Sequence, residues 1–290
     1  MAELKSITEH LNAEDIFAEM RMERQAFSGA FLLLEGLTDI KRFDKFFDGP
    51  NTSVVTCWGK LKLLELFQLV EASDLKGYLA FIDADFDSLT DNKIESENII
   101  YSEGHDFDID TIRTSVFNRY MREVSDNKKC AAVGDDAAVM CFIANSIRPL
   151  SLLKYSKILG NIDKSISSID WGNCYECTNF NLEKLVYRLL KKDAPSTELI
   201  KRTCDTAFSL DSEKLDIWQI TNGHDFFYAL GMSLKSQFGK RRKHHIESRE
   251  IEMHFRLTID DEDFRSMRVY DSINAWVARE NRPILSERFN

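Results

Sequence analysis

The stretch Ala30-Phe31-Leu32-Leu33-Leu34-Glu35-Gly36 decides the fold expected for this chain. Five consecutive apolar residues before an acid and a glycine are typical of a strand buried on both faces, as parallel strands in α/β proteins are. Similar apolar runs occur at 52–57, 78–82 and 98–101, and helical patterns lie between the first three at 40–47 and 61–71. This alternation of strands and helices predicts a parallel sheet flanked by helices, the α/β class.

The sequence on either side of this region has helical patterns. In the first 28 residues, Ser6-Ile7-Thr8-Glu9 has the form of a capping box, and Asn12 is a candidate cap for a second segment. Further helical patterns occur at 109–121, 135–159, 182–192, 225–238 and 263–280. We therefore predict an N-terminal helical segment at 1–28, an α/β domain at 29–125 and a helical domain at 126–290.

The 290 residues include 38 Lys and Arg against 48 Asp and Glu, a formal net charge of −10. This acidity argues against a protein that holds nucleic acid by bulk positive charge alone. It does not exclude a nuclease, because acidic clusters attract phosphate once they hold divalent ions. No apolar run has the roughly 18 residues of a membrane span, and the N-terminus lacks a signal-peptide core, so we expect a cytoplasmic protein without a membrane partner.

Acidic residues follow the first and third strands where each strand ends. Glu35 follows the first, and Asp83-Ala84-Asp85-Phe86-Asp87 follows the third. Functional sites of open parallel sheets lie outside the carboxyl ends of the strands. Because side chains alternate along an extended chain, we expect Asp83 and Asp85 to point to one side, joined by Asp87 if the extended conformation continues. If the two strands are neighbours, Glu35 faces this pair.

Carboxylates that converge at one sheet edge repel one another unless a cation lies between them. We expect Mg²⁺, or Mn²⁺ in its place, because such a hard ion takes carboxylate oxygens and keeps waters that a phosphate displaces. Phosphodiester hydrolysis suits this arrangement, since the metal activates water and neutralises the leaving oxygen. Each motif alone is more often a solvated strand end, so the metal site is predicted from their joint occurrence.

Two segments carry a resemblance to a known family, Leu33-Leu34-Glu35-Gly36-Leu37-Thr38-Asp39 and Phe81-Ile82-Asp83-Ala84-Asp85-Phe86-Asp87. They resemble the glutamate and DxD motifs of the Toprim domain of topoisomerases, primases and OLD-type nucleases. The Phe-Asp pair after the DxD is similar to the Toprim-like family that includes AriB, the effector of the PARIS anti-phage defence system. The resemblance covers about residues 28–110 and favours the nuclease branch, because a zinc-ribbon cysteine set is missing.

This resemblance implies roles for individual residues. Glu35 matches the Toprim glutamate, a general acid/base or metal ligand, while Asp83 and Asp85 match the DxD metal ligands. Asp39 and Asp87 are additional acids for a second metal position, as in OLD-like nucleases. The resemblance further implies a toxic effector that cuts RNA, with tRNA as the substrate, after release from an ABC/SMC-like ATPase of the same operon. It also implies a homodimer.

Two further segments contain candidate site residues. The one dense basic run in the acidic chain supplies candidate contacts for RNA phosphates or an acidic partner, namely Lys240, Arg241, Arg242 and Lys243. Such a run is also an ordinary solvated helix end. After the fourth strand, His105 or Asp106 is a candidate to reach the sheet edge, whereas Asp108 or Asp110 is expected to cap the next helix.

Two other functions are compatible with the sequence. The first is a non-catalytic regulatory subunit whose Toprim fold docks an ABC-type ATPase. The second is a receiver-like or phosphatase-like α/β protein with an Asp nucleophile. The second is less favoured, because those folds place the key Asp after the first strand, where Glu35 stands in this chain.

Overall fold

The computed structural model describes residues 11–163, 166, 171–176, 179–191, 194–240 and 247–289. The expected capping box at Ser6 lies outside these residues. The chain divides into two compact units: the first contains Met1–Asp83, Lys93–Ser102 and Asp260–Asn290, and the second contains Ala84–Asn92 and Glu103–Ile259. The three expected domains are consecutive segments with boundaries at 28/29 and 125/126, whereas these two units are interleaved along the chain.

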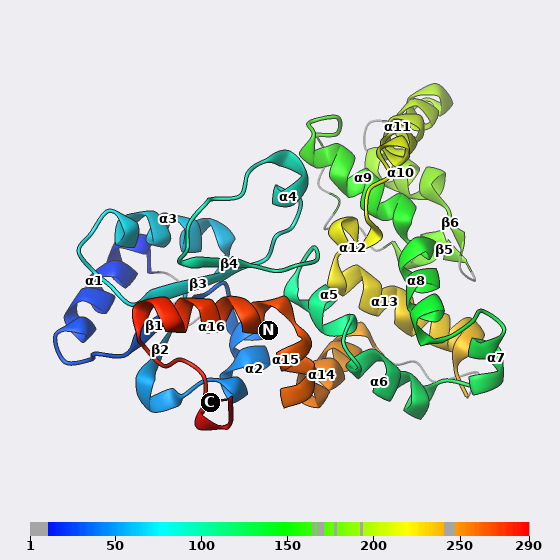
Figure 1. Cartoon of the computed structure of the whole chain (residues 1–290). Helices are drawn as coiled ribbons and strands as arrows, with labels where there is room; N and C mark the ends of the chain where they lie inside the picture. Colours follow the sequence, from blue (N-terminus) through cyan, green and yellow to red (C-terminus); the bar gives the residue numbers. More distant parts are fainter. Residues whose placement is uncertain are drawn as a thin grey trace, which may run out of the picture. The chain divides into compact units, whose positions relative to one another are not determined.

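The elements of the first unit are α1 (Ala13–Arg24), β1 (Ala30–Leu34), α2 (Leu37–Phe43), β2 (Thr52–Thr56), α3 (Lys60–Glu71), β3 (Tyr78–Ile82), β4 (Ile99–Tyr101), α15 (Asp261–Ser266) and α16 (Arg268–Glu280) (Figure 1). Those of the second unit are α4 (Asp87–Thr90), α5 (Phe107–Ile112), α6 (Val116–Val124), α7 (Asn127–Ala131), α8 (Asp136–Ser146), α9 (Arg148–Ile158), β5 (Tyr175–Glu176), β6 (Asn179–Phe180), α10 (Leu182–Leu190), α11 (Thr197–Ser209), α12 (Ile217–Ile220), α13 (Gly223–Ser233) and α14 (Ser248–Thr258).

The first unit is built on a four-stranded sheet in the order β2-β1-β3-β4. All neighbouring strands are parallel, with Leu33 of β1 level with Val55 of β2 and Ala80 of β3. The α/β class and the four strands predicted from the sequence are therefore confirmed. From β1 the chain passes to β2 on one side and then to β3 on the other, so the strand order reverses between β1 and β3. Ligands of open α/β sheets bind at such a switch point.

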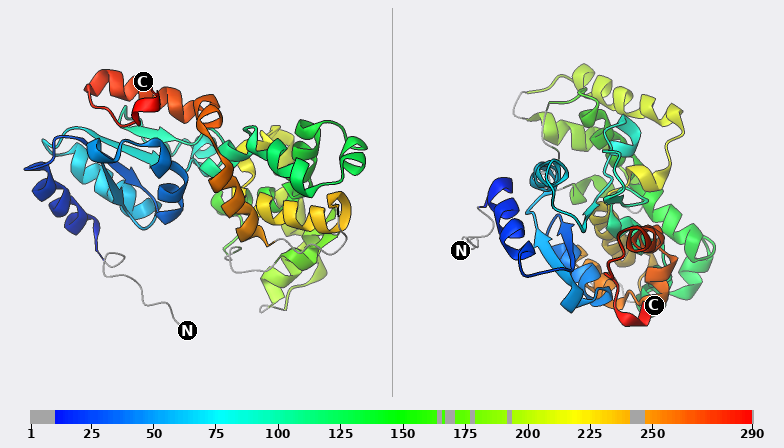
Figure 2. Two further views of the ribbon diagram at one scale, coloured as in Figure 1. Left: turned by 90° about the horizontal axis from the view of Figure 1, so that it is seen from below. Right: turned by 60° about the vertical axis from the view of Figure 1, so that its left-hand side comes forward.

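Helices cover both faces of this sheet, and Figure 2 shows α1 and α16 on opposite sides of the strands. On one face, Phe31 and Ala80 pack in a buried cluster with Phe67 of α3. On the other face, the ring of Phe81 lies 5.3 Å from that of Phe43 in an edge contact. Strands buried on both faces explain why their sequences are continuous apolar runs.

The C-terminal helices α15 and α16 belong to the first unit. Phe264 of α15 stacks on Phe46, which follows α2, with ring centroids 4.1 Å apart. Trp276 of α16 donates from Nε1 to Asn98 Oδ1 at 3.1 Å, beside β4. The expected helical domain at 126–290 therefore differs from the unit that forms, because an apolar helix face does not reveal which partner it packs against.

The helical patterns of the sequence correspond to real helices with different bounds. The pattern predicted as one helix at 135–159 is two helices, α8 and α9, since Pro149 lacks the amide needed to continue the ladder and suits the first turn of α9. Asn12 caps α1 as expected, in a capping box with Asp15. Among the described residues, no single helix has the length and apolar character to cross a membrane, and α8 with α9 meets that test only as a pair bent by 52°.

Candidate active site

The first unit brings Glu35 and Asp83 together at the carboxyl ends of two adjacent strands. Glu35 directly follows β1 and Asp83 directly follows β3. The Glu35 carboxylate accepts a hydrogen bond from the Asp83 amide, with 2.9 Å between Oε1 and N. Both side chains are partly exposed. The structure thus places the predicted glutamate against the first predicted aspartate at the switch point of the sheet.

Lys60, the first residue of α3, joins this pair from the turn that follows β2. Its ammonium donates from Nζ to the backbone carbonyl of Asp83 at 2.7 Å. The preceding Gly59 has a φ of +124°, a conformation that glycine adopts readily, and its amide donates to the Glu35 carbonyl at 2.8 Å. Lys60 was not among the residues predicted from the sequence, although Gly59-Lys60 follows the second apolar run at the same edge.

Cys57 directly follows β2 at the same edge of the sheet and is fully buried. Burial raises the pKa of the Cys57 thiol to about 12, and the negative charge of Glu35 contributes in the same direction. The thiol therefore stays protonated near neutral pH, which makes it an unreactive packing residue rather than a nucleophile or metal ligand.

Asp39, expected as an additional metal ligand, has a local role at the start of α2. Its Oδ2 accepts from the Gly36 amide at 3.1 Å, which satisfies one of the first amides before the helix. Its Oδ1 pairs with Nη1 of Arg42 at 3.0 Å, and Arg42 is only 2% exposed. The carboxylate thus balances a buried guanidinium, so at least part of its charge serves the stability of the first unit.

The two aspartates of the DxD motif belong to different units, because the division falls between Asp83 and Ala84. The expectation that the extended conformation continues through the motif is wrong. Strand β3 ends at Ile82, Asp85 has a left-handed φ of +47°, and α4 begins at Asp87. Asp is among the residues that tolerate this conformation best, so the side-chain alternation of a strand does not describe the motif.

In the second unit, Asp85 lies beside His105. The Asp85 amide donates to the His105 carbonyl at 2.6 Å, and the Asp85 Oδ1 lies 3.8 Å from Nε2 of the imidazole. The other ring nitrogen, Nδ1, is 3.1 Å from the Gln219 carbonyl, a contact that fits a proton on Nδ1. Burial lowers the pKa of His105, although the charge of Asp85 acts against this shift. His105 was a sequence candidate, and its partner is the second aspartate of the motif.

Phe86, between Asp85 and Asp87, anchors this loop in the second unit. It is 8% exposed, meets the ring of His105 edge-on at 4.6 Å and stacks on Tyr155 at 5.3 Å. The aromatic residue of the motif therefore has a packing role, holding the backbone of Asp85 in place beside His105.

The helix that follows β4 is capped by a residue other than those expected. Asp106 is the cap of α5: its Oδ1 accepts from the Ile109 amide at 2.8 Å and its Oδ2 from the Gly223 amide at 2.7 Å. Asp110 instead accepts from the amides of Glu103 and Gly104. Burial raises the pKa of Asp110 to about 6, while these two amide bonds act in the opposite direction.

The basic run is described only at its first residue. Lys240 donates from Nζ to the carbonyls of Arg122 and Glu123 at 2.8 and 2.7 Å, near the C-terminal end of α6. A cation at this end satisfies carbonyls that lack helical partners and complements the helix dipole. Arg241, Arg242 and Lys243 lie outside the described residues.

The donor groups at the sheet edge fit a hard divalent ion in their chemistry. Carboxylate oxygens are the ligands that Mg²⁺ and Mn²⁺ take, and Glu35 and Asp83 supply them at one edge. Within the part of the chain that the structure describes, no three His, Cys, Asp or Glu side chains lie close enough to hold an ion as they stand.

Comparison with known proteins gave no significant match to a family model, to a curated protein or to a solved structure.

Proposed function

We propose that this chain is a metal-dependent nuclease of the Toprim-like type, with RNA as its preferred substrate. One observation carries the proposal: the Glu35 carboxylate is held 2.9 Å from the Asp83 amide at the point where the strand order reverses. Open parallel sheets bind their ligands there, and a glutamate with an aspartate is the donor set that divalent-metal phosphodiester chemistry uses.

Each residue of the group has a distinct proposed role. By the motif resemblance, Asp83 and Asp85 would hold Mg²⁺ or Mn²⁺, which would lower the pKa of a water molecule and neutralise charge on the phosphate. Glu35 moves the proton between the attacking water and the leaving oxygen. Lys60, already held by the Asp83 carbonyl, adds positive charge at the same edge. Asp39 and Asp87 remain candidates for a second metal position.

The biological setting is proposed from the motif resemblance. The chain acts in the cytoplasm as a toxic effector of anti-phage defence and is held inactive by an ABC/SMC-like ATPase of the same operon. After release it cleaves tRNA, works as a homodimer and contacts RNA through the run at 240–243.

The direct test is cleavage of labelled tRNA and of plasmid DNA by the purified chain in Mg²⁺, in Mn²⁺ and in EDTA. We expect metal-dependent cleavage, with RNA the better substrate. Glu35→Gln removes the proton-transfer group and should lower the rate by at least about 100-fold. The matched control is Glu65→Gln, an exposed acid on α3 in the same unit, which should cleave like wild type.

Two results would overturn the proposal. Cleavage by Glu35→Gln at the wild-type rate would exclude the assigned role of Glu35. A wild-type chain that cleaves neither nucleic acid in either metal, with no Mg²⁺ or Mn²⁺ binding by calorimetry, would favour a non-catalytic subunit that docks an ATPase.

A further inference from the structure

The first unit contains a pocket at the end of the sheet opposite to Glu35 and Asp83. It is bounded by α1, by the turn at 74–76 before β3 and by Arg282 after α16, and its volume is about 680 Å³. Gly29 and Gly77, which border it, precede β1 and β3. Five-residue strands span roughly 17 Å, so the pocket is separate from the carboxyl ends of the strands. Its volume lies within the roughly 300–1,000 Å³ typical of small-molecule sites.

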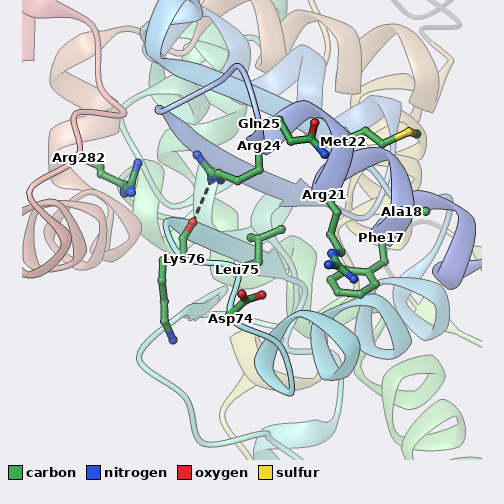
Figure 3. A pocket seen from close by; sticks show the side chains of 10 residues that line it. All are labelled: Phe17, Ala18, Arg21, Met22, Arg24, Gln25, Asp74, Leu75, Lys76 and Arg282. Atoms are coloured by element: carbon green, nitrogen blue, oxygen red, sulfur yellow. Dashed lines mark hydrogen bonds between the residues drawn. The ribbon is translucent and has the colours of Figure 1, made fainter.

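Positive charge dominates this pocket in an otherwise acidic chain. The lining includes four cations, Arg21, Arg24, Lys76 and Arg282, against a single carboxylate, Asp74. Figure 3 shows Arg24 and Arg282 turned toward each other at one end and Arg21 beside Phe17 at the other.

The two inner guanidinium groups are held by backbone carbonyls. Arg24 donates from Nη1 to Gly29 at 2.7 Å and from Nη2 to Lys76 at 3.0 Å, and its guanidinium carbon lies 4.2 Å from the ring centroid of Phe31. Arg282 donates to the carbonyls of Ser28 and Gly29. Among the described residues, neither guanidinium forms an ion pair with a carboxylate, and backbone carbonyls are the hydrogen-bond partners of both.

The proximity of these two charges has an energetic consequence. Burial lowers the pKa of Arg24, and the positive charge of Arg282 lowers it further. Two like charges at one end of a pocket repel each other, and a bound anion relieves that repulsion. Gly77 permits the arrangement, because its φ is +72° and a Cβ atom there would collide with the Arg282 side chain.

Apolar side chains complete the lining. Leu75 is 5% exposed at the base, while Met22 is 63% exposed at the rim. Phe17 offers its ring, with the guanidinium carbon of Arg21 at 5.9 Å from the centroid. A ring and a thioether beside a cationic group suit a ligand that joins a flat apolar part to a strongly anionic part.

We infer that this pocket is a second ligand site, which binds a nucleoside diphosphate or a similar nucleotide. Guanidinium groups recognise phosphate oxygens through paired N–H donors, so Arg282 and the ammonium of Lys76 receive the phosphates at one end of the pocket, while Arg21 lies with Phe17 at the other end, beside the base. Phe17, Met22 and Leu75 receive the base. The site is independent of the proposed metal chemistry, since Glu35 and Asp83 lie at the other end of the strands.

The test is isothermal titration of the full chain with ADP in EDTA, which removes any metal bridge at the carboxylate edge. We expect binding of ADP in the micromolar to submillimolar range, weakening as salt is raised because exposed charges take part. Adenosine and inorganic phosphate, each carrying half of the recognised chemistry, should each bind at least about tenfold more weakly.

Variants locate the site. Arg21 and Lys76 have exposed side chains, so Arg21→Glu and Lys76→Glu should fold normally and weaken ADP binding by at least about tenfold. The control is Arg268→Glu, a charge reversal at an exposed side chain at the start of α16. It should change ADP binding less than about twofold. Glu35→Gln should also bind ADP like wild type.

Three results would overturn the inference: no ADP binding by wild type, equal binding by Arg21→Glu and Lys76→Glu, or loss of binding in Glu35→Gln. The last would place the ligand at the carboxylate edge. Because binding is measured without metal or cleavage, failure here leaves the nuclease proposal intact, and failure of the nuclease assay leaves this site intact.

Discussion

The carboxylate of Glu35 accepts a hydrogen bond from the backbone amide of Asp83, with 2.9 Å between Oε1 and the amide nitrogen. The bond links the ends of β1 and β3, two neighbouring strands whose end residues are 48 positions apart in the chain. It fixes the glutamate at the sheet edge through the backbone of Asp83 and does not involve the Asp83 carboxylate.

Shortening Glu35 tests this geometry. Glu35→Asp keeps the charge but removes one methylene, so the carboxylate no longer reaches the Asp83 amide. If position matters as well as charge, metal-dependent cleavage should fall about 100-fold, because small misplacements of catalytic groups are costly. Single-turnover cleavage of labelled tRNA measures the rate, and thermal unfolding verifies the fold. Wild-type cleavage by Glu35→Asp would contradict the role assigned to this bond.

Arg24 is expected to stabilise the first unit. Its two terminal nitrogens donate to the carbonyls of Phe27, Gly29, Lys76 and Gly77, which joins α1 to the starts of β1 and β3. Arg24→Met keeps the apolar stem but removes all four bonds; Gly29 still accepts from Arg282 and Gly77 from the Phe31 amide, whereas the carbonyls of Phe27 and Lys76 lose this donor. The change should lower the free energy of unfolding by about 2–3 kcal/mol.

The control for Arg24 is Arg21→Met on the same helix, where the side chain is exposed and the change should stay within about 0.5 kcal/mol. Denaturant titration followed by circular dichroism measures both variants. Equal effects would show that the carbonyl contacts of Arg24 contribute little.

Asp110 should make stability depend on pH. Its pKa is about 6 in the folded chain against an ordinary value of 3.8, because burial disfavours the carboxylate. Between these values the folded chain binds more protons than the unfolded chain, so the free energy of unfolding falls as the pH rises. The contribution is complete below pH 3.8 and is lost as the pH passes through about 6.

Comparison with Asp110→Asn isolates this effect. Relative to that variant, the wild type should lose up to about 3 kcal/mol between about pH 4 and about pH 7. Denaturant titrations at several pH values measure the difference, and carbon NMR of the carboxyl group gives the pKa directly. A difference between the two proteins that stays constant with pH would show that Asp110 titrates at its ordinary value.

Removing either partner of the Lys154–Asp225 ion pair should lower the free energy of unfolding, but by different amounts. The Asp225 side chain is 5% exposed and that of Lys154 is 25% exposed, so only the lysine has access to water. Lys154→Met leaves a buried carboxylate unpaired and should cost about 3 kcal/mol, whereas Asp225→Asn should cost less. A double-mutant cycle by denaturant unfolding measures their coupling. Equal single-variant costs would contradict the difference in burial.

The sequence by itself determined the sheet and the edge where the candidate site lies. Apolar runs specified four strands, of which β1 and β3 are fully buried, and the acids directly after these two fell at the carboxyl edge that parallel strands share. These features follow from local patterns. A run of consecutive apolar residues indicates a buried strand, and a helix between two such runs indicates that the strands are parallel.

Only the tertiary structure decided which groups meet at that edge. Lys60 reaches the Asp83 carbonyl because β2 and β3 flank β1, and the DxD motif divides between units because β3 ends at Ile82 and Asp85 turns toward His105. The position of α16 against β4 and the basic pocket around Arg282 likewise join segments far apart in the chain. The sequence shows which face of a helix is apolar and which residues are charged. Which segment packs against that face, or pairs with that charge, depends on packing across the whole unit.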